Sequence, residues 1–425
     1  MPSAALFWWH LASAFLQGPW HLAPLIDRGA ECLGERPRWL PGLAGRILAT
    51  FPEDGARPDA EALTQFIGRD PGFAAGTRRI FRGSLRMGPT RWPVPALPSP
   101  AALAGWVGLT LRELDWFADC QGREAHRPPG PLRHYTYRWV AKRSGRQRLI
   151  EMPKQRLKTI QRRLLHDLLD HIPPHEAAHA YRRGRSVRTY AAPHAGRPIV
   201  LRFDLRDFFP SVRASRVHAL FRAAGYPIPA ARLLTGLCCN AVPADVREAV
   251  PRDAAAYAVP HLPQGAPTSP ALANLCAHRL DCRLAALAAS RRGCYTRYAD
   301  DLAFSGGEEL ERGARRFQVL VCRVALEEGF EVHTRKSRFM RQGVRQQLAG
   351  VVVNERPNVK RVDFDELKAI LCNCARQGPA SQNRDRRADF RAYLLGRIAY
   401  VGLLNPARGA KLRQLFERIA WGADV

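Results

Sequence analysis

The sequence lacks long apolar runs and paired cysteines, and each absence excludes a class of protein. None of its 425 residues falls in a run of 18 apolar residues, so no membrane-spanning helix is expected. The ten cysteines are scattered, and none forms a Cys-x-x-Cys pair or lies at zinc-finger spacing from histidine. We therefore expect reduced thiols, no membrane partner and a cytoplasmic protein.

Acidic residues and lysines are also scarce, and this shortage indicates the kind of partner. The chain has 66 basic and 38 acidic side chains, which gives a formal net charge of +28. Residues 1–130 carry 14 basic and 12 acidic side chains, whereas residues 131–425 carry 52 and 26. A soluble protein this basic usually acts on nucleic acid, so we expect the nucleic-acid surface within 131–425. Only 7 of the 66 basic residues are lysine, so each lysine is a candidate for a role that arginine cannot fill.

The pattern along the chain predicts three segments. Residues 1–126 read as a helical region that contains a linker rich in proline and glycine at 83–100, followed by a short helix at about 100–119. A breaker cluster at 127–132 marks the main boundary. Residues 127–359 have a mixed α/β pattern, and residues 360–425 read as helical. The N-terminal region contains four tryptophans that are candidates for a small core or a contact surface: Trp8, Trp9, Trp20 and Trp39.

Alternation and helical spacing predict the elements of the central segment. Strands are expected at 134–140, 148–152, 198–203, 294–298, 302–305, 331–339 and 346–353. Helices are expected at 154–171, 269–290 and 308–328. Ser144-Gly145 is the predicted turn of the first hairpin.

Three aspartates fall at predicted strand ends. Asp204 follows the strand at 198–203, and Asp300 and Asp301 occupy the tip of the hairpin at 294–305. A buried carboxylate alone is costly, and three brought together repel one another unless cations join them. Carboxylates suit Mg²⁺, and two such ions roughly 4 Å apart can activate a hydroxyl and stabilise a leaving pyrophosphate. An Asp-Asp pair in a turn is by itself often only a solvated turn.

The order of five motifs supplies the stronger argument. They are FDLRDFFPSV at 203–212, LPQGAPTSP at 262–270, YADD at 298–301, HTRKS at 333–337 and QLAGVVVN at 347–354. This series resembles the palm motifs, the lysine motif and the primer grip of reverse transcriptases. The resemblance covers about 131–425. It implies an α/β (α+β) right-hand polymerase, with fingers and palm at 127–359, a helical thumb at 360–425 and a helical N-terminal extension.

Within that family the chain resembles the retron type, which is compact and has no RNase H domain. The retron signature Asn-Ala-x-x-His appears here as Tyr190-Ala191-Ala192-Pro193-His194, so the asparagine differs. The retron Val-Thr-Gly triplet appears as Leu348-Ala349-Gly350, which keeps only the glycine. These departures leave open another defence-associated bacterial enzyme. A group II intron-like enzyme is disfavoured, because no DNA-binding or endonuclease segment follows the thumb.

The resemblance implies roles for particular residues. The predicted catalytic residues are Asp204, Asp300, Asp301 and Lys336, and the predicted metal ligands for two Mg²⁺ ions are Asp204, Asp300, Asp301 and Leu205. The predicted nucleotide-binding residues are Arg148, Lys142, Phe209, Gln264 and Gly265. The predicted primer or template contacts are Tyr298, Ala349, Gly350 and His194.

Several of these residues also have plainer interpretations. Phe209 is interpreted as the aromatic gate that excludes a ribose 2′-hydroxyl, and the alternative is a core phenylalanine; Phe208 is expected in the core. Lys336 is interpreted as a proton donor to pyrophosphate, and the alternative is a simple phosphate contact. Arg148 and Lys142 could be generic surface charges, and His194 could cap a loop instead of contacting RNA.

The function implied is retron-type RNA-directed DNA polymerisation with dNTPs. Such an enzyme would copy its own structured non-coding RNA from a 2′-hydroxyl primer into a branched RNA–DNA product (msDNA). Retron systems are similar to anti-phage defence modules with a separate effector protein. One alternative is a catalytically idle RNA-binding scaffold, and the three aspartates argue against it. The other is an RNA-templated RNA polymerase, and the bulky Phe209 argues against it.

Overall fold

The structure is a computed structural model, and it describes residues 2–33, 36–70, 86–141, 147–249 and 256–421. The chain divides into two compact units, each built from two separate stretches of sequence. Unit 1 comprises residues 1–172 and 212–269, and unit 2 comprises residues 173–211 and 270–425. The division at residues 126 and 359 concerns sequence segments and stays a prediction.

Helices form the N-terminal part of unit 1, which confirms the helical prediction for the described residues up to 70. They are α1 (Pro2–Leu16), α2 (Leu22–Leu33), α3 (Leu40–Thr50) and α4 (Ala60–Arg69). Trp20 is a core residue, and its indole N–H donates to the carbonyl of Phe51 at 2.9 Å. Trp8 and Trp39 pack against the same core. This bundle therefore has its own small hydrophobic core.

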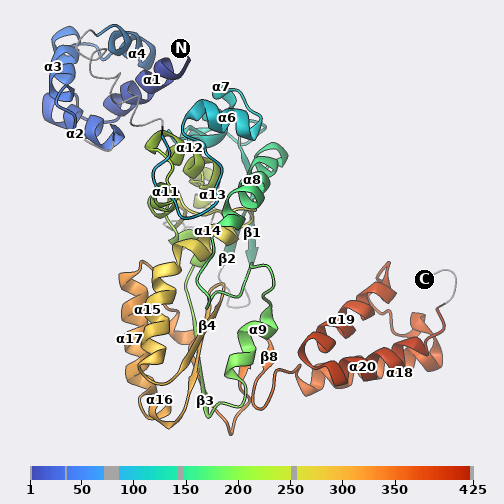
Figure 1. The fold of residues 1–425 in the computed structure, drawn as a ribbon. Coiled ribbons are helices and arrows are strands. Elements are labelled where there is room, and N and C mark those ends of the chain that lie inside the picture. Colours follow the sequence, from blue (N-terminus) through green and yellow to red (C-terminus); the bar gives the residue numbers. More distant parts are fainter. Residues whose placement is uncertain (1, 34–35, 71–85, 142–146, 250–255, 422–425) are drawn as a thin grey trace. The chain divides into compact units, whose positions relative to one another are not determined.

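The rest of unit 1 combines a β-hairpin with short helices (Figure 1). Strands β1 (Tyr135–Ala141) and β2 (Gln147–Pro153) pair antiparallel, which confirms the predicted hairpin; its predicted turn at 144–145 lies outside the described residues. Helix α8 (Gln155–Asp167) buries Leu157, Ile160 and Leu164 at helical spacing. The remaining helices are α6 (Pro100–Val107), α7 (Leu111–Ala118), α11 (Ala214–Ala223), α12 (Ile228–Cys238) and α13 (Ala244–Glu248).

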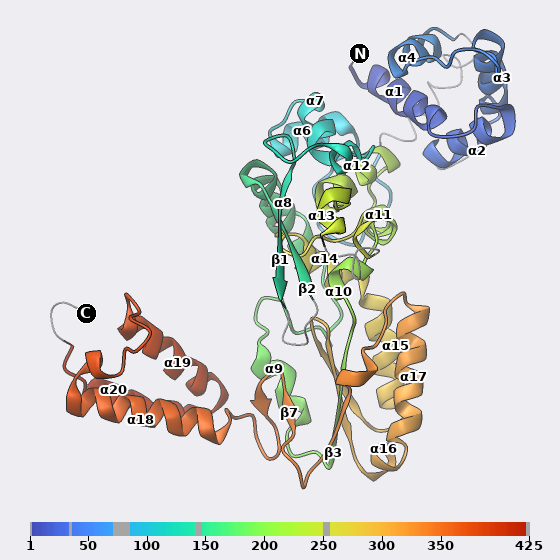
Figure 2. The same ribbon diagram turned by 180° about the vertical axis from the view of Figure 1, so that it is seen from behind.

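Unit 2 is built on an antiparallel sheet with the strand order β4-β5-β3-β6. The strands are β3 (Ile199–Asp204), β4 (Cys294–Tyr298), β5 (Asp301–Gly306) and β6 (Arg338–Arg341). Figures 1 and 2 show α15 (His278–Ala289) and α17 (Ala314–Glu327) on one side of this sheet and α9 (Val187–Ala191) on the other. Two other short helices are α10 (Phe208–Ser211) and α16 (Glu308–Arg312).

Four predicted elements differ from the structure. The strand expected at 346–353 is two short strands, β7 (Gln347–Leu348) and β8 (Val351–Val352), joined by a turn. The helix expected at 269–290 is two helices, because α14 (Ser269–Cys276) ends before Ala277, where the backbone leaves helical geometry. The helix expected at 308–328 is likewise divided at Gly313 into α16 and α17. The strand expected at 331–339 forms a single bridge at Val332, then a 3-10 turn (Thr334–Lys336), and only then β6.

The C-terminal part of unit 2 is helical, as predicted for the described residues after 360. It contains α18 (Arg361–Gln377), α19 (Phe390–Leu404) and α20 (Pro406–Glu417). The preceding hairpin consists of β7 (Gln347–Leu348) and β8 (Val351–Val352). Apolar residues of these helices and of the hairpin belong to one core cluster.

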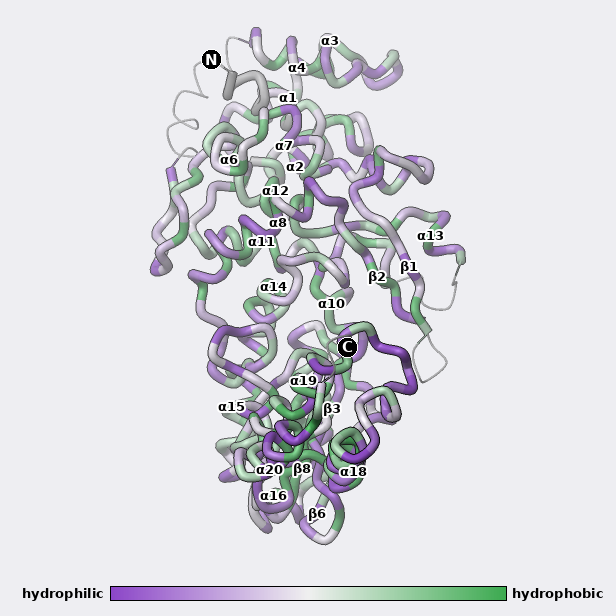
Figure 3. Tube along the Cα trace, turned by 90° about the vertical axis from the view of Figure 1, so that its right-hand side faces the viewer, coloured by the Kyte–Doolittle hydropathy of each residue, from purple (hydrophilic) through white to green (hydrophobic). Residues whose placement is uncertain are grey.

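Hydrophobic and hydrophilic residues alternate over short distances along the chain (Figure 3). None of the described helices is long and apolar enough to cross a membrane. All ten cysteines lie in the described ranges, and no disulfide joins any two of them.

Candidate active site

The predicted catalytic aspartates meet on two neighbouring strands. Asp204 ends β3 and lies directly opposite Asp301, the first residue of β5. Tyr298 pairs with Asp301, so Ala299 and Asp300 form a two-residue turn between β4 and β5. The N–H of Leu205 donates to the carbonyl of Asp300 at 2.8 Å, which ties this turn to the end of β3.

The backbone of this turn is strained. Ala299 has a φ of 56°, a left-handed conformation that non-glycine residues seldom adopt. The surrounding structure must hold such a residue in place, and strained residues of this kind are often found at functional sites. The small alanine side chain limits the steric cost at this position.

Burial and mutual repulsion shape the electrostatics of the three carboxyl groups. Asp204 is only 7% exposed. Desolvation, followed by the charges of Asp301 and Asp204, raises the pKa of Asp300 to about 6. Desolvation also raises the pKa of Asp301, although Arg202 opposes this shift. The cluster therefore favours a proton or a cation at Asp300.

Two cationic side chains already neutralise two of these carboxylates. The Lys336 ammonium donates to Oδ1 of Asp204 at 2.7 Å. The Arg202 guanidinium donates from Nε and Nη2 to the two oxygens of Asp301, at 2.9 and 3.2 Å. Our sequence reasoning missed Arg202. The available signal was a charged residue in the otherwise apolar strand PIVLRF.

The donor set has the chemistry that a divalent cation requires, since hard carboxylate oxygens are the preferred ligands of such ions. Among the described residues, however, no three acidic, histidine or cysteine side chains are arranged to hold a metal ion. The positive groups of Lys336 and Arg202 lie on Asp204 and Asp301. A metal ion at Asp204 would compete with Lys336 for Oδ1.

A second arginine, which is fully buried, contacts the strained turn. Arg297 is fully buried on β4 and forms a two-point ion pair with the equally buried Asp281 of α15, at 2.8 and 2.7 Å. Its Nη1 donates to Oδ1 of Asn274 at 2.9 Å and to the carbonyl of Ala299 at 3.1 Å. The hydroxyl of Tyr295 donates to the same aspartate at 2.8 Å. We call these four side chains the turn network: Arg297, Asp281, Asn274 and Tyr295.

The aromatic residues next to the carboxylates have distinct environments. Phe209, on α10, is partly exposed, and its ring lies 6.2 Å from that of Tyr181. Phe208 is 5% exposed and stacks on Phe330 with centroids 5.7 Å apart, which confirms its predicted place in the core. Tyr298 is partly buried beside Tyr190, at 5.5 Å between ring centroids.

The predicted primer-grip residues form the tip of the β7–β8 hairpin. Leu348 pairs with Val351, so Ala349 and Gly350 make a two-residue turn. Their φ angles are 43° and 88°, and positive values at both positions are typical of the tight turns that join such hairpins. Gly350 is exposed at this tip.

The predicted contact of His194 with primer or template is wrong. The side chain is fully buried. Because the Thr296 hydroxyl donates to the carbonyl of Tyr190, the His194 Nε2–H donates to Thr296, and Nδ1 accepts from Ser305, both at 2.7 Å. Burial lowers the pKa of His194 to about 3, so the ring is neutral. It joins the segment before β3 to β4 and β5 and has no nitrogen left for RNA.

The predicted nucleotide-binding residues of unit 1 lie on β2 and in the loop before α14. Arg148 is exposed on β2, whereas Lys142 lies outside the described residues. Gln264 and Gly265 form the loop, and the φ of Gly265 is 134°. A Cβ atom at Gly265 would lie 2.8 Å from the carbonyl oxygen of Glu151, so only glycine fits this backbone.

Comparison with known proteins agrees with this geometry. The family described as reverse transcriptase (RNA-dependent DNA polymerase) matches residues 140–364. The chain is 38% identical to the Retron Mx65 reverse transcriptase of Myxococcus xanthus over 379 residues, which cover 84% of each chain. It is 38% identical to the Retron Mx162 reverse transcriptase of the same organism, over 76% of this chain and 67% of the relative. It is 31% identical to the Retron Ec86 reverse transcriptase of Escherichia coli, over 53% and 65%.

The fold and the aspartate cluster thus define a right-hand nucleic-acid polymerase. The chain belongs to the reverse transcriptase family, and specifically to its retron type. Its activity is RNA-directed DNA polymerisation, and reverse transcriptases use divalent metal ions for this reaction.

Proposed function

We propose that this enzyme copies a structured non-coding RNA into a branched RNA–DNA product (msDNA), primed from a 2′-hydroxyl of the same RNA. The likeness to retron enzymes over most of the chain supports this proposal. The observation that carries it is the cluster of Asp204, Asp300 and Asp301 at the β3 end and the hairpin turn. A role in anti-phage defence with a separate effector protein is part of the same proposal.

The metal site of the proposal consists of the three aspartates and Leu205. Two Mg²⁺ ions held there would activate the 3′-hydroxyl and stabilise the leaving pyrophosphate. Lys336 is half exposed beside Asp204, so its ammonium can leave the carboxylate and donate a proton to the pyrophosphate. Arg202 remains on Asp301 and orients it.

The remaining residues bind the nucleotide and the nucleic acid. Phe209 is partly exposed, as an aromatic gate under the sugar must be to exclude a ribose 2′-hydroxyl. Arg148 is exposed, and its planar guanidinium suits the triphosphate; Lys142 assists it. The Gln264–Gly265 loop contacts the incoming nucleotide. Tyr298 contacts the primer end, and Ala349 and Gly350 support the primer strand.

The test is primer extension on an RNA template, with dNTPs and NTPs in separate reactions. Asp204→Asn and Asp300→Asn should each abolish DNA synthesis, because each removes a metal ligand but few phosphate contacts. RNA affinity should stay near that of the wild type. The exposed Asp27→Asn in α2 is the matched control and should extend normally.

Near wild-type extension by either active-site variant would contradict the metal assignment. Efficient extension with NTPs by the wild type would contradict the proposed role of Phe209 in excluding ribonucleotides. Sequencing of nucleic acid that copurifies with the enzyme tests the retron part: the proposal requires one RNA species joined to DNA through a 2′ branch. A mixture of unrelated RNAs would contradict it.

A further inference from the structure

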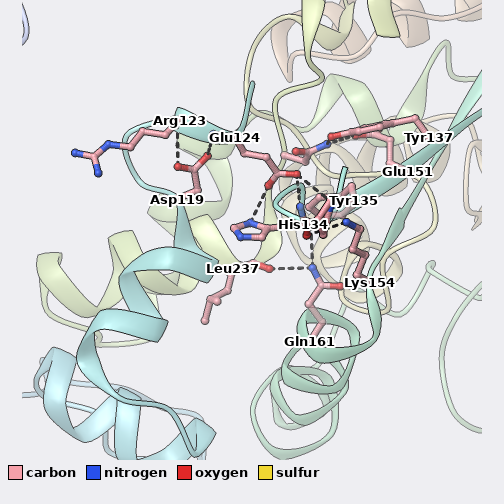
Figure 4. Close-up of polar contacts among 12 residues, drawn as sticks. Asp119, Arg123, Glu124, His134, Tyr135, Tyr137, Glu151, Lys154, Gln161 and Leu237 are labelled. Atoms are coloured by element: carbon pink, nitrogen blue, oxygen red, sulfur yellow. Dashed lines mark hydrogen bonds and ion pairs between the residues drawn. The ribbon is translucent and has the colours of Figure 1, made fainter. Parts of the chain in front are cut away.

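A buried charged network lies against the Gln264–Gly265 loop of unit 1. Glu151, on β2, and His261 are both completely buried, and Nε2 of His261 lies 3.0 Å from Oε1 of Glu151. The side-chain amide of Asn240 donates to the other carboxylate oxygen at 2.7 Å and to the Tyr137 hydroxyl at 3.2 Å. Figure 4 shows Glu151 beside Tyr137. We call Glu151, His261 and Asn240 the loop network.

The hydrogen bonds of His261 bear on the protonation state of its ring. Nδ1 lies 2.8 Å from the carbonyl oxygen of Val259, and Nε2 faces the carboxylate of Glu151. When the carboxyl group of Glu151 is ionised, both partners are acceptors, so both ring nitrogens must carry a proton for both contacts to be hydrogen bonds. The ring is then an imidazolium, paired with a carboxylate inside the protein.

A buried ion pair of this kind is suited to holding the two backbone segments that carry it in a fixed arrangement. Removing two charges from water is costly, and good hydrogen bonding at every polar atom is needed to offset that cost. Here the imidazolium donates two hydrogen bonds and the carboxylate accepts two, so each group is satisfied. A hydrophobic replacement could be equally stable, so the charges call for a role other than stability.

The loop network is connected to the loop through the backbone. Asn240 and His261 exchange two backbone hydrogen bonds, at 2.9 and 3.0 Å, which anchors the start of the segment that leads to Gln264. The N–H of Glu151 donates to the carbonyl of Gln264 at 2.9 Å. The carbonyl of Glu151 is the atom that leaves no room for a side chain at Gly265. Both main-chain groups of Glu151 thus lie against the loop, and its side chain contacts His261 at the start of the segment that leads to the loop.

We propose that Glu151 is a positioning residue for nucleotide binding. Its carboxylate keeps His261 as an imidazolium, and the pair holds the Gln264–Gly265 loop at a fixed distance from β2. The inference rests on the proposed role of this loop in binding the incoming nucleotide. The loop takes its binding geometry from the buried ion pair of Glu151 and His261.

The kinetic test compares Glu151→Gln with the wild type in single-nucleotide incorporation by the full chain. Glutamine preserves the shape and loses the charge. KM for dNTP should rise at least about tenfold, with kcat within about threefold, because loosened positioning weakens binding before chemistry. RNA affinity should not change. The exposed Glu53→Gln is the control and should match the wild type.

An unchanged KM, or a fall in kcat alone, would overturn the positioning role. A second measurement does not depend on whether Glu151→Gln folds. In the wild-type protein with ¹⁵N-labelled histidine, His261 should show protons on both ring nitrogens at neutral pH; its signals are those absent from His261→Gln. A single ring proton on His261 would overturn the ion pair. Because the NMR result does not involve catalysis, it also separates failure of this inference from failure of the proposed polymerase reaction.

Discussion

The two units hold their functional segments with buried charges of different kinds. In unit 2 the turn network holds the strained Ala299 through Arg297, whose guanidinium stays charged at any pH that the protein tolerates. In unit 1 the loop network holds the Gln264–Gly265 loop through His261, whose charge depends on one proton. The charge that supports the Ala299 turn is therefore permanent, whereas the charge that we propose to support the Gln264–Gly265 loop lies on a titratable side chain.

The largest effect is expected from breaking the ion pair between Arg297 and Asp281. Arg297→Met should lower the free energy of unfolding by about 3–5 kcal/mol, because it leaves the carboxylate of Asp281 buried without a partner. It should also reduce DNA synthesis, since the carbonyl of Ala299 loses its donor. Urea denaturation measures the first effect and primer extension the second.

The matched control is Arg312→Met, which removes an exposed pair with Glu308 one helical turn away. Exposed pairs contribute little, so it should cost less than about 1 kcal/mol. Equal losses in the two variants would mean that the turn network is no more than ordinary packing.

An intermediate effect is expected at Asp300, where an ionised carboxylate lowers the stability of the folded protein. The folded-state pKa of about 6 lies above the ordinary value of 3.8, so the folded protein binds the proton more tightly than the unfolded chain. The contribution of Asp300 to the free energy of unfolding should therefore become more favourable as pH falls from about 7 towards 4, and its ionised carboxylate should cost about 3 kcal/mol at pH 7.

Asp300→Asn removes this titration. In buffer with a chelator, the variant should be more stable than the wild type at pH 7, and the difference should shrink as the pH falls to 4. Urea denaturation at several pH values measures this difference. A variant that is less stable at pH 7, or a difference that does not change with pH, would contradict the shifted pKa.

The smallest effect is expected at the edge of the loop network. Tyr137→Phe removes one hydrogen bond from Asn240 and leaves its stronger bond to Glu151 in place. The expected loss is about 0.5–1.5 kcal/mol in free energy of unfolding, with KM for dNTP unchanged. A large rise in KM would show that the network extends into β1 and that Glu151 is not its centre.

The sequence allowed the aspartate cluster to be predicted because its three carboxylates fall at the ends of predicted strands, in motifs whose order resembles a known family. A strand that ends at Asp204 and a hairpin with Asp300 and Asp301 at its tip need only one strand pairing to bring the carboxylates together. The order of the motifs indicated that this pairing forms, although about a hundred residues separate the two segments.

The supporting residues could not be predicted in the same way. The signal for Arg202 was one charged residue in an apolar strand, and Arg297 is one of 59 arginines, with no sequence pattern that distinguishes it as buried. The partners of Glu151 lie about a hundred residues away, so that network appears only when the strands are in place. His194 was misassigned because a polar residue in a motif was expected at the surface.

The division of each unit into two stretches has a consequence for the order of synthesis. Unit 1 needs residues 212–269, which the ribosome makes only after it has made the first stretch of unit 2. At roughly 5–20 residues per second, about 5–20 s pass between residue 172 and residue 269. In the first part of that interval the residues of β2 have been made, but Asn240 and His261 have not. Because a buried carboxylate without partners is costly, Glu151 should stay in contact with water until these two residues have been made.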